Sequence, residues 1–421
     1  MINTSFMIVK HLIIENFRAI ERLDIDCSKS VNVFIGDNGA GKSSVLDAIS
    51  ILYSWLIARI NSTKGKGQSI KKADIRNSAS YCYLSIEVEH HGIEASWSLY
   101  KAVPAYRIEF QRKTDLEQLN GFVETFLSSM GTEGSLLFYY GVNRNVVSIR
   151  YDKSLSKKKS NTSSYFDSSV SVNWKAFFNW FYESENEENR MKVWFNPKYH
   201  NEALDAVRDC LSDVFPGYSN LRIEDKPTRL VIQKNNQKVN FDRLSDGEKC
   251  YITLVLDIAR RLVTSNTGGD SPLSGTQIVM IDEVDLHLHP SWQLHVISNL
   301  EKKFPNCQFF ITSHSSLVLS SLKDSGQLVV LRDGKRLEVS DIPYGDNGDY
   351  ILKRFFNMNE VRNPEVQAVI DEISSELSKN DTDIQRVETK LTWLSEHGVQ
   401  FDESAKMRLL LAQKKRVYEK A

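Results

Sequence analysis

The stretch Gly36–Ser43, GDNGAGKS, constrains the fold of this chain more than any other part of the sequence. It matches the pattern G-x-x-x-x-G-K-S, in which a glycine-rich turn wraps backbone N–H groups around a phosphate. The apolar run VNVFI precedes it, and residues 42–60 follow it with apolar side chains at helical spacing. A strand, a tight loop and a helix in this order predict an α/β fold with a phosphate site at the start of the helix.

Each polar residue of this loop has a possible chemical role. Lys42 can reach the β- and γ-phosphates of a nucleotide, and the Ser43 hydroxyl can bind Mg²⁺. The residues predicted to bind the nucleotide here are Gly36, Asp37, Asn38, Gly39, Ala40, Gly41, Lys42, Ser43 and Ser44. A chance glycine-rich turn is the alternative, and the strand and helix on either side of the motif argue against it.

A second segment, 278–283, has four apolar residues followed by two acids. This pattern predicts a buried parallel strand that delivers carboxylates to the carboxyl-terminal edge of a sheet, where ligands bind in open α/β folds. Asp282 is suited to hold Mg²⁺, and Glu283 is suited to orient the attacking water and accept its proton. Many strands end in acids, so the prediction depends on the phosphate loop. Together the two motifs predict an ATPase that uses ATP and Mg²⁺.

A third motif, LSDGE at 244–248, directly precedes an apolar-periodic helix. It resembles the signature sequence of ABC-type ATPases, in the form found in the soluble branch that contains the SMC, RecF and OLD-type ATPases. The resemblance implies that Ser245, Asp246, Gly247 and Glu248 bind a γ-phosphate at a helix N-terminus. A helix cap, with Ser at the N-cap and Glu three residues later, explains the same residues, and both interpretations can hold together.

Other segments resemble the same branch in the same order. DLHLHP at 285–290 stands where the D-loop belongs, and ITSH ends at His314, which resembles the switch histidine that contacts the γ-phosphate. LIIENFRAI at 12–20 resembles the first strand of SMC/RecF-like heads. Metal binding is an alternative role for His287 and His289, although no third ligand cluster accompanies them.

One element of the family pattern is missing from the sequence. No convincing glutamine-containing loop follows the first lobe, where the family has one. The run SLLFYYGV at 135–142 predicts a buried strand, and Asn143 and Arg144 directly after it are possible substitutes. Arg144 could contact a phosphate or make a structural salt bridge.

The family resemblance also implies a homodimer. In this branch, ATP lies between the phosphate loop of one subunit and the signature of the other. A chain with one copy of each motif needs a partner, most simply a second copy of itself. Roughly 200 residues separate Lys42 from Ser245 without sustained heptads, so long coiled-coil arms are not expected.

The expected architecture is an ABC ATPase head of the α/β class, with a mixed sheet and an antiparallel β lobe. We expect residues 1–111 to form the N-terminal ATPase lobe and 112–220 a helical insertion. Residues 221–345 would form the C-terminal ATPase lobe with the signature and the acidic strand, and 346–421 a helical extension. Basic loops at 64–72 and 153–159 could contact DNA or an RNA–DNA element through phosphates, although solvated loops explain them too.

Composition excludes several classes of protein. With 53 Lys+Arg against 54 Asp+Glu, the formal charge is -1, which excludes a uniformly basic nucleic-acid binder. There is no uninterrupted run of ~18 apolar residues and no signal-peptide layout, so neither a membrane span nor secretion is expected. The 5 cysteines are scattered and never spaced C-x-x-C, which argues against a disulfide framework or a zinc site and favours the cytoplasm.

The segment 344–367 resembles the C-terminal region of ATPases from bacterial anti-phage systems, above all the PtuA ATPase of Septu and related retron systems. That resemblance implies that the ATPase dimer restrains an effector nuclease of the HNH type. Three alternatives remain: a RecF-like repair ATPase that clamps DNA, a transporter subunit, and an OLD-like ATPase with its own nuclease. For the last, Asp341, Asp346 and Asp349 lie in a turn-rich stretch and are better interpreted as turn and cap residues.

Overall fold

The computed structural model describes most of the chain in two compact units, Met1–Ile351 and Leu352–Ala421. The described residues are 7–103, 112–129, 137–144, 174–225, 228–266, 271–339, 341–358, 363–379, 382–399, 407 and 410–412. The basic loop expected at 153–159 lies outside them. All five cysteines lie within them, and each is free and buried.

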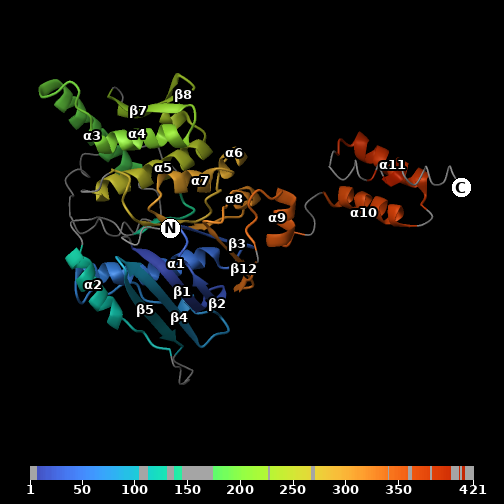
Figure 1. The fold of residues 1–421 in the computed structure, drawn as a ribbon, viewed down its shortest axis with the longest axis horizontal. Coiled ribbons are helices and arrows are strands. Elements are labelled where there is room, and N and C mark those ends of the chain that lie inside the picture. Colours follow the sequence, from blue (N-terminus) through green and yellow to red (C-terminus); the bar gives the residue numbers. More distant parts are fainter. Residues whose placement is uncertain are drawn as a thin grey trace. The chain divides into compact units, whose positions relative to one another are not determined.

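The first unit is built on one large sheet whose described strands follow the order β5-β4-β1-β2-β13-β12-β3-β11-β10-β6 (Figure 1). Their bounds are β1 (Ile8–Phe17), β2 (Ile20–Asp26), β3 (Val31–Gly36), β4 (Tyr81–His90), β5 (Ile93–Ala102), β6 (Leu137–Tyr140), β10 (Ile278–Ile281), β11 (Gln308–Thr312), β12 (Gln327–Arg332) and β13 (Lys335–Leu337).

The sheet has two halves with different pairing. Strands β12, β3, β11, β10 and β6 run parallel, and their side chains are almost entirely buried. Strands β5, β4, β1 and β2 pair antiparallel. The α/β class with a mixed sheet and an antiparallel β lobe is therefore confirmed. Because parallel strands end at a common edge, the loops after β3, β6, β10 and β11 meet there.

Helix α1 (Lys42–Asn61) packs into the main hydrophobic core beside the sheet. Its contact with the antiparallel half is fixed by Trp97, whose indole Nε1 donates to the Leu52 carbonyl at 3.0 Å. By length and composition α1 is the one described helix that could cross a membrane, yet 67% of its most apolar window is buried inside the protein. This burial is typical of a core helix.

The segment 112–220, expected to form a helical insertion, divides between two places in the fold. Helix α2 (Glu117–Ser129) packs on β5 and α1, and β6 pairs with β10, so both join the main sheet. Helices α3 (Trp174–Trp194) and α4 (Glu202–Val214) pack instead with α5 (Asp246–Ser265). The buried aromatic run LFYY of β6 is the physical reason, because such a strand is stable only inside a sheet.

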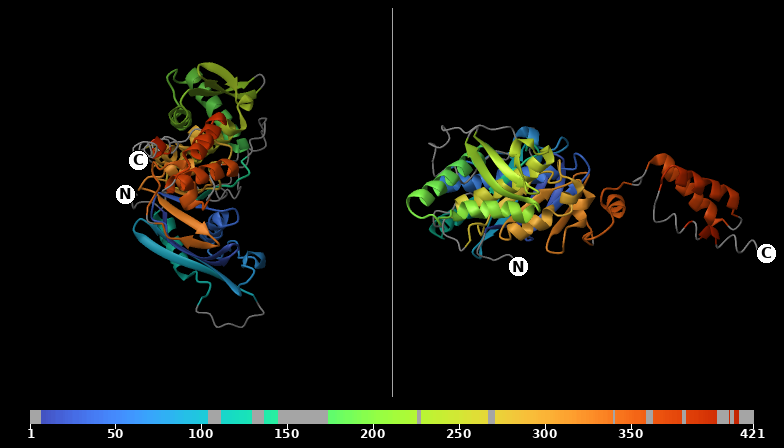
Figure 2. Two further views of the ribbon diagram at one scale, coloured as in Figure 1. Left: turned by 90° about the vertical axis from the view of Figure 1, so that its right-hand side faces the viewer. Right: turned by 90° about the horizontal axis from the view of Figure 1, so that it is seen from above.

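A small sheet of β7 (Tyr218–Asp225), β8 (Thr228–Lys234) and β9 (Gln237–Asn240) completes the layer of α3, α4 and α5. In Figures 1 and 2 these green and yellow elements gather on one side of the first unit, and the blue antiparallel strands gather on the other. Two short helices follow the D-loop: α6 (Pro290–Gln293) ends in a tight turn in which the His295 N–H donates to the Trp292 carbonyl, and α7 (Val296–Lys303) begins directly after it.

The remaining described helices are α8 (Ser316–Ser320) and α9 (Gly348–Phe355), which spans the boundary between the units in sequence. The second unit contains α10 (Pro364–Ser378) and α11 (Ile384–Glu396). Their apolar faces form a separate small core that includes Ile373, Val387 and Leu394. The apolar faces of these two helices are therefore packing surfaces.

A buried ionic network connects β6 to α5. Asp257 is fully buried on α5, accepts a hydrogen bond from the Tyr140 hydroxyl at 3.1 Å, and pairs with Arg260 and Arg261 at 2.8 Å each. Burial acts to raise the pKa of Asp257, but the charges of Arg260 and Arg261 hold it below the ordinary value. The network therefore ties the edge strand of the parallel half to the helix beside it.

We expect Asp257→Ala to destabilise the first unit by roughly 3–5 kcal/mol, because it leaves two arginines without their buried partner. Urea unfolding followed by tryptophan fluorescence measures this, with Asp209→Ala on the exposed face of α4 as a control expected to change stability by less than about 0.5 kcal/mol. The pKa of Asp257 is lower in the folded protein than in the unfolded chain. Its contribution to the free energy of unfolding should therefore be complete above about pH 4 and be lost as the pH falls through the pKa of the folded state. Equal stability of the two variants would contradict this role.

Candidate nucleotide-binding site

The phosphate loop lies between the end of β3 and the start of α1, as the sequence predicts. Lys42 is only 6% exposed, and its Nζ donates to the carbonyls of Gly36 and Asp37 at 2.9 Å each. Burial lowers the pKa of Lys42, and the nearby carboxylates of Glu283 and Asp282 act in the opposite direction. Lys42 therefore holds the loop closed through two of its carbonyls. The backbone N–H groups of such a loop can bind a phosphate.

Gly41 is one of the glycines that this loop requires. It caps α1 in the left-handed conformation, with φ 107°. A Cβ at this position would lie 2.7 Å from Cγ1 of Ile20, so a side chain would meet both backbone strain and a steric clash. The glycine is therefore required where the loop turns into the helix.

Ser43 and Asp282, which the sequence predicts as Mg²⁺ ligands, lie together. The Ser43 hydroxyl donates to Oδ1 of Asp282 at 3.0 Å, and the Thr312 hydroxyl donates to the same oxygen at 2.6 Å. These residues come from α1, the end of β10 and the end of β11. A hydroxyl and a carboxylate oxygen at this spacing fit Mg²⁺, which prefers oxygen ligands and keeps several waters. Thr312 was not among the predicted residues, although its place at the end of a buried strand next to His314 could have indicated it.

Glu283 follows Asp282 in an unusual backbone conformation, with φ 48°. Its N–H donates to the Thr312 hydroxyl at 2.7 Å, and its carbonyl accepts from Nη2 of Arg144 at 2.5 Å. A left-handed conformation costs a non-glycine residue on the order of 1–3 kcal/mol and persists only where the surroundings hold it. Two side-chain hydrogen bonds, one to each of the peptide groups on either side of the Glu283 Cα, provide that support. Thus Arg144, one of the two substitutes considered for the missing glutamine, lies at the acidic strand.

The D-loop and the switch segment are joined through Asp285. Its Oδ1 accepts from the Ser313 hydroxyl at 2.7 Å and from the backbone N–H of His314 at 3.3 Å. Burial and the charge of Lys42 lower the pKa of His314, so the neutral imidazole is favoured at neutral pH. The carboxylates of Asp282, Glu283 and Asp285 act electrostatically on Lys42, His314 and Arg144 alike. The predicted catalytic residues Lys42, Glu283 and His314 therefore lie close together in one site.

The signature residues form the expected helix cap at the start of α5. The Glu248 N–H donates to the Ser245 hydroxyl at 3.3 Å, and the Ser245 N–H donates to Oε2 of Glu248 at 2.7 Å. Burial acts to raise the pKa of Glu248, but hydrogen bonds from Lys234, Tyr218 and Ser245 lower it to about 2. Glu248 is therefore an ionised structural residue in this chain.

Gly247 brings the signature against the D-loop. A Cβ on this glycine would lie 2.2 Å from the carbonyl oxygen of His287, so no larger residue fits. Ser245 and Asp246 are exposed, in contrast to the buried Lys42. Within the described chain, no hydrogen bond or ion pair given for the signature residues reaches the phosphate loop.

The alternative metal sites receive no support from the described residues. His287 and His289 are exposed, and neither falls within a group of three close potential ligands. The same holds for Asp341, Asp346 and Asp349. His289 instead caps α6 by accepting from the Ser291 N–H.

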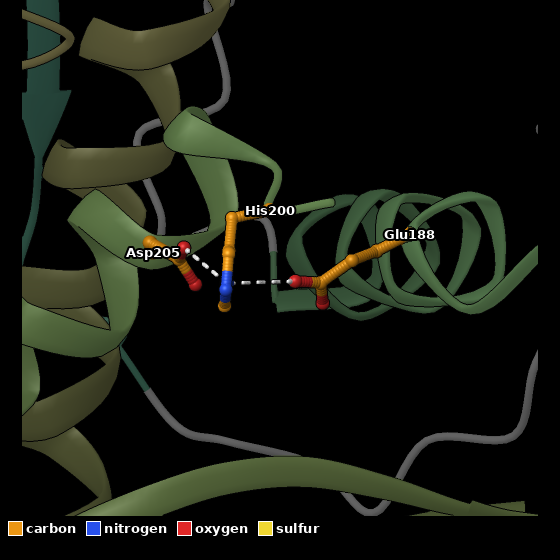
Figure 3. A group of neighbouring side chains, drawn as sticks. All are labelled: Glu188, His200 and Asp205. Atoms are coloured by element: carbon orange, nitrogen blue, oxygen red, sulfur yellow. Dashed lines mark ion pairs between the residues drawn. The ribbon is translucent and has the colours of Figure 1, made fainter. Parts of the chain in front are cut away.

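One group does have three potential metal ligands, namely Glu188 on α3, Asp205 on α4 and His200 in the connection between the two helices (Figure 3). Its carboxylates already have cationic partners. The Lys192 ammonium lies 2.9 Å from one oxygen of Glu188, and Arg208 lies 3.0 Å from the other and 3.1 Å from Asp205. The group is therefore an ion-pair network that joins two helices, and a metal would have to displace these cations.

A cavity of about 790 Å³ opens beside the phosphate loop. It is lined by Asp37, Asn38, Gly39 and Ala40 of the loop together with Arg18, Ala19, Ala73, Ile75, Arg76, Asn77, Ser78, Asp333 and Gly334. This cavity mixes apolar side chains with polar ones that can orient a ligand, as small-molecule sites do. Residues 73–78 were not predicted as site residues. In the sequence, the polar run DIRNS at 74–78 is only a weak indication of a site. Its position beside the phosphate loop is decided by the fold and not by local sequence.

Comparisons with known proteins show the family of the chain. Residues 8–335 match the family model described as the RecF/RecN/SMC N terminal domain. The chain belongs to this family. It is an ABC-type ATPase, and the prediction of ATP hydrolysis is confirmed at the level of the family.

Three relatives are similar over most of their length. The retron Ec83 probable ATPase of Escherichia coli is 29% identical, over 84% of this chain and 76% of its own. The retron Vc95 probable ATPase of Vibrio cholerae serotype O1 biovar El Tor is 26% identical, over 91% and 86%. The Septu protein PtuA of Bacillus thuringiensis is 21% identical, over 89% and 90%.

We expect Lys42→Ala to weaken ATP binding by roughly ten- to a hundredfold, because a charge-assisted hydrogen bond contributes about 1.5–3 kcal/mol. Equilibrium binding of a fluorescent ATP analogue measures the effect. The matched control is Lys29→Ala, which removes an exposed lysine at the opposite end of β3 and should leave binding unchanged. Wild-type affinity in Lys42→Ala would contradict the placement of the triphosphate in this loop.

Proposed function

We propose that two copies of this ATPase close around Mg²⁺-ATP, with each nucleotide held by the phosphate loop of one copy and the signature of the other. Both motifs occur once in the chain. Each places a helix N-terminus, with its partial positive charge, beside a glycine-containing turn. The exposure of Ser245 and Asp246, and the lack of contact between them and the described phosphate loop, support binding across a two-fold interface.

In this proposal the residues at the ends of the parallel strands carry out hydrolysis. Lys42 binds the β- and γ-phosphates, and Ser43 and Asp282 hold Mg²⁺, which stabilises negative charge on the phosphates. Glu283 orients the attacking water and accepts its proton, and His314 contacts the γ-phosphate. The backbone of Asp37–Ser44 and the signature residues 245–247 complete the anion site, while Glu248 holds the cap in place. The nucleoside occupies the cavity lined by Arg18 and Arg76.

We further propose that the ATP-bound dimer restrains an effector nuclease, of the HNH type, in anti-phage defence. The names of the relatives support this role, since two are retron ATPases and another is a Septu protein. Closing and opening of the dimer would be the switch, because the γ-phosphate holds the two copies together and its hydrolysis releases them.

A second candidate function is a RecF-like clamp on DNA. Two observations favour it: RecF belongs to the matched family, and a RecF protein of Leptospira interrogans is 32% identical over 30% of this chain. The loop after α1 also exposes Lys64, Lys66, Lys71 and Lys72, which could neutralise phosphates. A clamp would bind DNA without any other protein, whereas the defence role requires a nuclease partner.

We expect Glu283→Gln to keep ATP affinity, to lower the turnover number by about 10²–10⁴-fold, and to accumulate the closed dimer. Sedimentation velocity with and without ATP measures dimer formation, and phosphate release measures turnover. Glu124→Gln on the exposed face of α2 is the control and should behave as wild type. Wild-type turnover in Glu283→Gln would refute the assignment of the base.

Co-expression separates the two candidate functions. The chain is produced with an HNH-type nuclease encoded beside it, and the two are followed through size-exclusion chromatography with ATP. Co-elution of a silent nuclease that becomes active after nucleotide turnover supports the defence role. Tight, ATP-dependent DNA binding by the pure chain, lost at high salt and unaffected by the nuclease, would support the clamp and contradict the defence role.

A further inference from the structure

Arg144 lies at the edge of the sheet where the nucleotide residues gather. Strands β6 and β10 are parallel neighbours, with Tyr140 in register with Ile281. The pairing continues for one more residue, since the Asp282 N–H donates to the Tyr140 carbonyl at 2.8 Å. The residues that follow the two strands are therefore held at the same level, and Arg144 is placed next to the acidic pair by the sheet itself.

The guanidinium of Arg144 is buried and only partly used. The residue is 3% exposed, and its Nη2 donates to the Glu283 carbonyl at 2.5 Å. Its Nε and Nη1 are buried without a hydrogen-bond partner among the described residues. Burial lowers the pKa of Arg144, but a guanidinium keeps its charge in proteins. A buried cation with two unused donors is costly unless an anion is brought to it.

The charged groups around Arg144 indicate which anion would bind to its guanidinium. The carboxylates of Asp282, Glu283 and Asp285 act on Arg144 as they act on Lys42 and His314. The buried thiol of Cys250 on α5 is a weak partner of Arg144: burial raises the pKa of this thiol, and the charge of Arg144 and a hydrogen bond from it act to lower that pKa. A neutral thiol cannot satisfy the charge. The planar fork of an arginine matches phosphate oxygens, and the site already prepared among these residues is for a triphosphate.

We propose that Arg144 is a catalytic residue of this ATPase, whose Nη1–H binds the terminal phosphate while the neighbouring Nη2–H holds the carbonyl of Glu283. One rigid group then fixes the distance between the phosphate and the backbone of the base. Hydrogen bonds from Arg144 stabilise the transition state most, because negative charge develops there on the transferred phosphoryl group. Arg144 therefore acts on turnover more than on binding of the ground state. This inference rests on the proposed role of Glu283.

The test compares Arg144→Gln and Arg144→Lys with the matched variants Arg59→Gln and Arg59→Lys. Arg59 on α1 also has a buried Nε without a partner among the described residues. It lies 17 residues along the helix from Lys42, roughly 25 Å away. The measurements are ATP turnover, affinity for ADP, affinity for ADP with aluminium fluoride as a mimic of the transferred phosphoryl group, and the melting temperature.

For Arg144→Gln we expect turnover to fall by about 10²–10³-fold, with loss of tight aluminium-fluoride binding and unchanged affinity for ADP. Arg144→Lys keeps the charge without the fork and should recover part of the turnover and of the trapping. It also provides the test if Arg144→Gln does not fold. Both Arg59 variants should bind and turn over as wild type.

Two outcomes would overturn the proposal. The first is wild-type trapping of ADP and aluminium fluoride by either Arg144 variant. The second is a loss of ADP affinity in step with turnover, which indicates a purely structural role. Failure of the dimer proposal can be distinguished from failure of this one. A wild-type protein that hydrolyses ATP as a monomer would contradict the binding of ATP between two copies. The comparison of the variants' affinities for ADP with aluminium fluoride would still be valid.

Discussion

One carboxylate oxygen, Oδ1 of Asp282, connects the elements on which the rest of the site depends. It accepts from Ser43 at the start of α1 and from Thr312 at the end of β11, while Asp282 itself ends β10. Thr312 in turn receives the N–H of Glu283 and so helps to hold the proposed base in its left-handed conformation. Hydrogen bonds among a few residues thereby join the phosphate loop, the proposed Mg²⁺ ligands and the proposed catalytic carboxylate at one edge of a parallel sheet.

The second constraint is the separation of two anion sites within one chain. Helices α1 and α5 each begin at a turn suited to a phosphate, but the first site contains buried Lys42 and the second exposes Ser245. The cap that makes the second site is rigid, because Glu248 is tied to Lys234 and Gly247 packs on the carbonyl of His287. A preformed, solvent-exposed anion site is well suited to complete the site of another molecule.

Much of this could be predicted from the sequence, because the chemistry lies in short contiguous motifs. The phosphate loop, the acidic strand and the helix cap each combine a local backbone geometry with its functional side chains, and the structure places all three at the predicted elements. The resemblance to ABC-type ATPase heads implied the mixed sheet, whereas apolar runs bounded by turn residues predict only its separate strands.

What could not be predicted depends on long-range pairing. The sequence around β6 does not say which strand it joins, so neither its pairing with β10 nor the contact between Arg144 and Glu283 could be foreseen. The cavity lined by residues 73–78 likewise forms only when that segment returns to the phosphate loop. Thr312 owes its role to the register of β11 beside β10, which is set by the whole sheet.

Mixing two inactive variants tests the shared site most directly. Lys42→Ala removes the phosphate-loop cation, and Ser245→Asp places a second carboxylate beside the ionised Glu248, where it repels phosphate. If each nucleotide is held by two copies, both variants alone are inactive. Their equal mixture, by contrast, recovers about a quarter of wild-type turnover, because half the dimers then contain one intact site of two. No recovery in a mixture shown to form mixed dimers, or full activity of Ser245→Asp alone, would contradict the account.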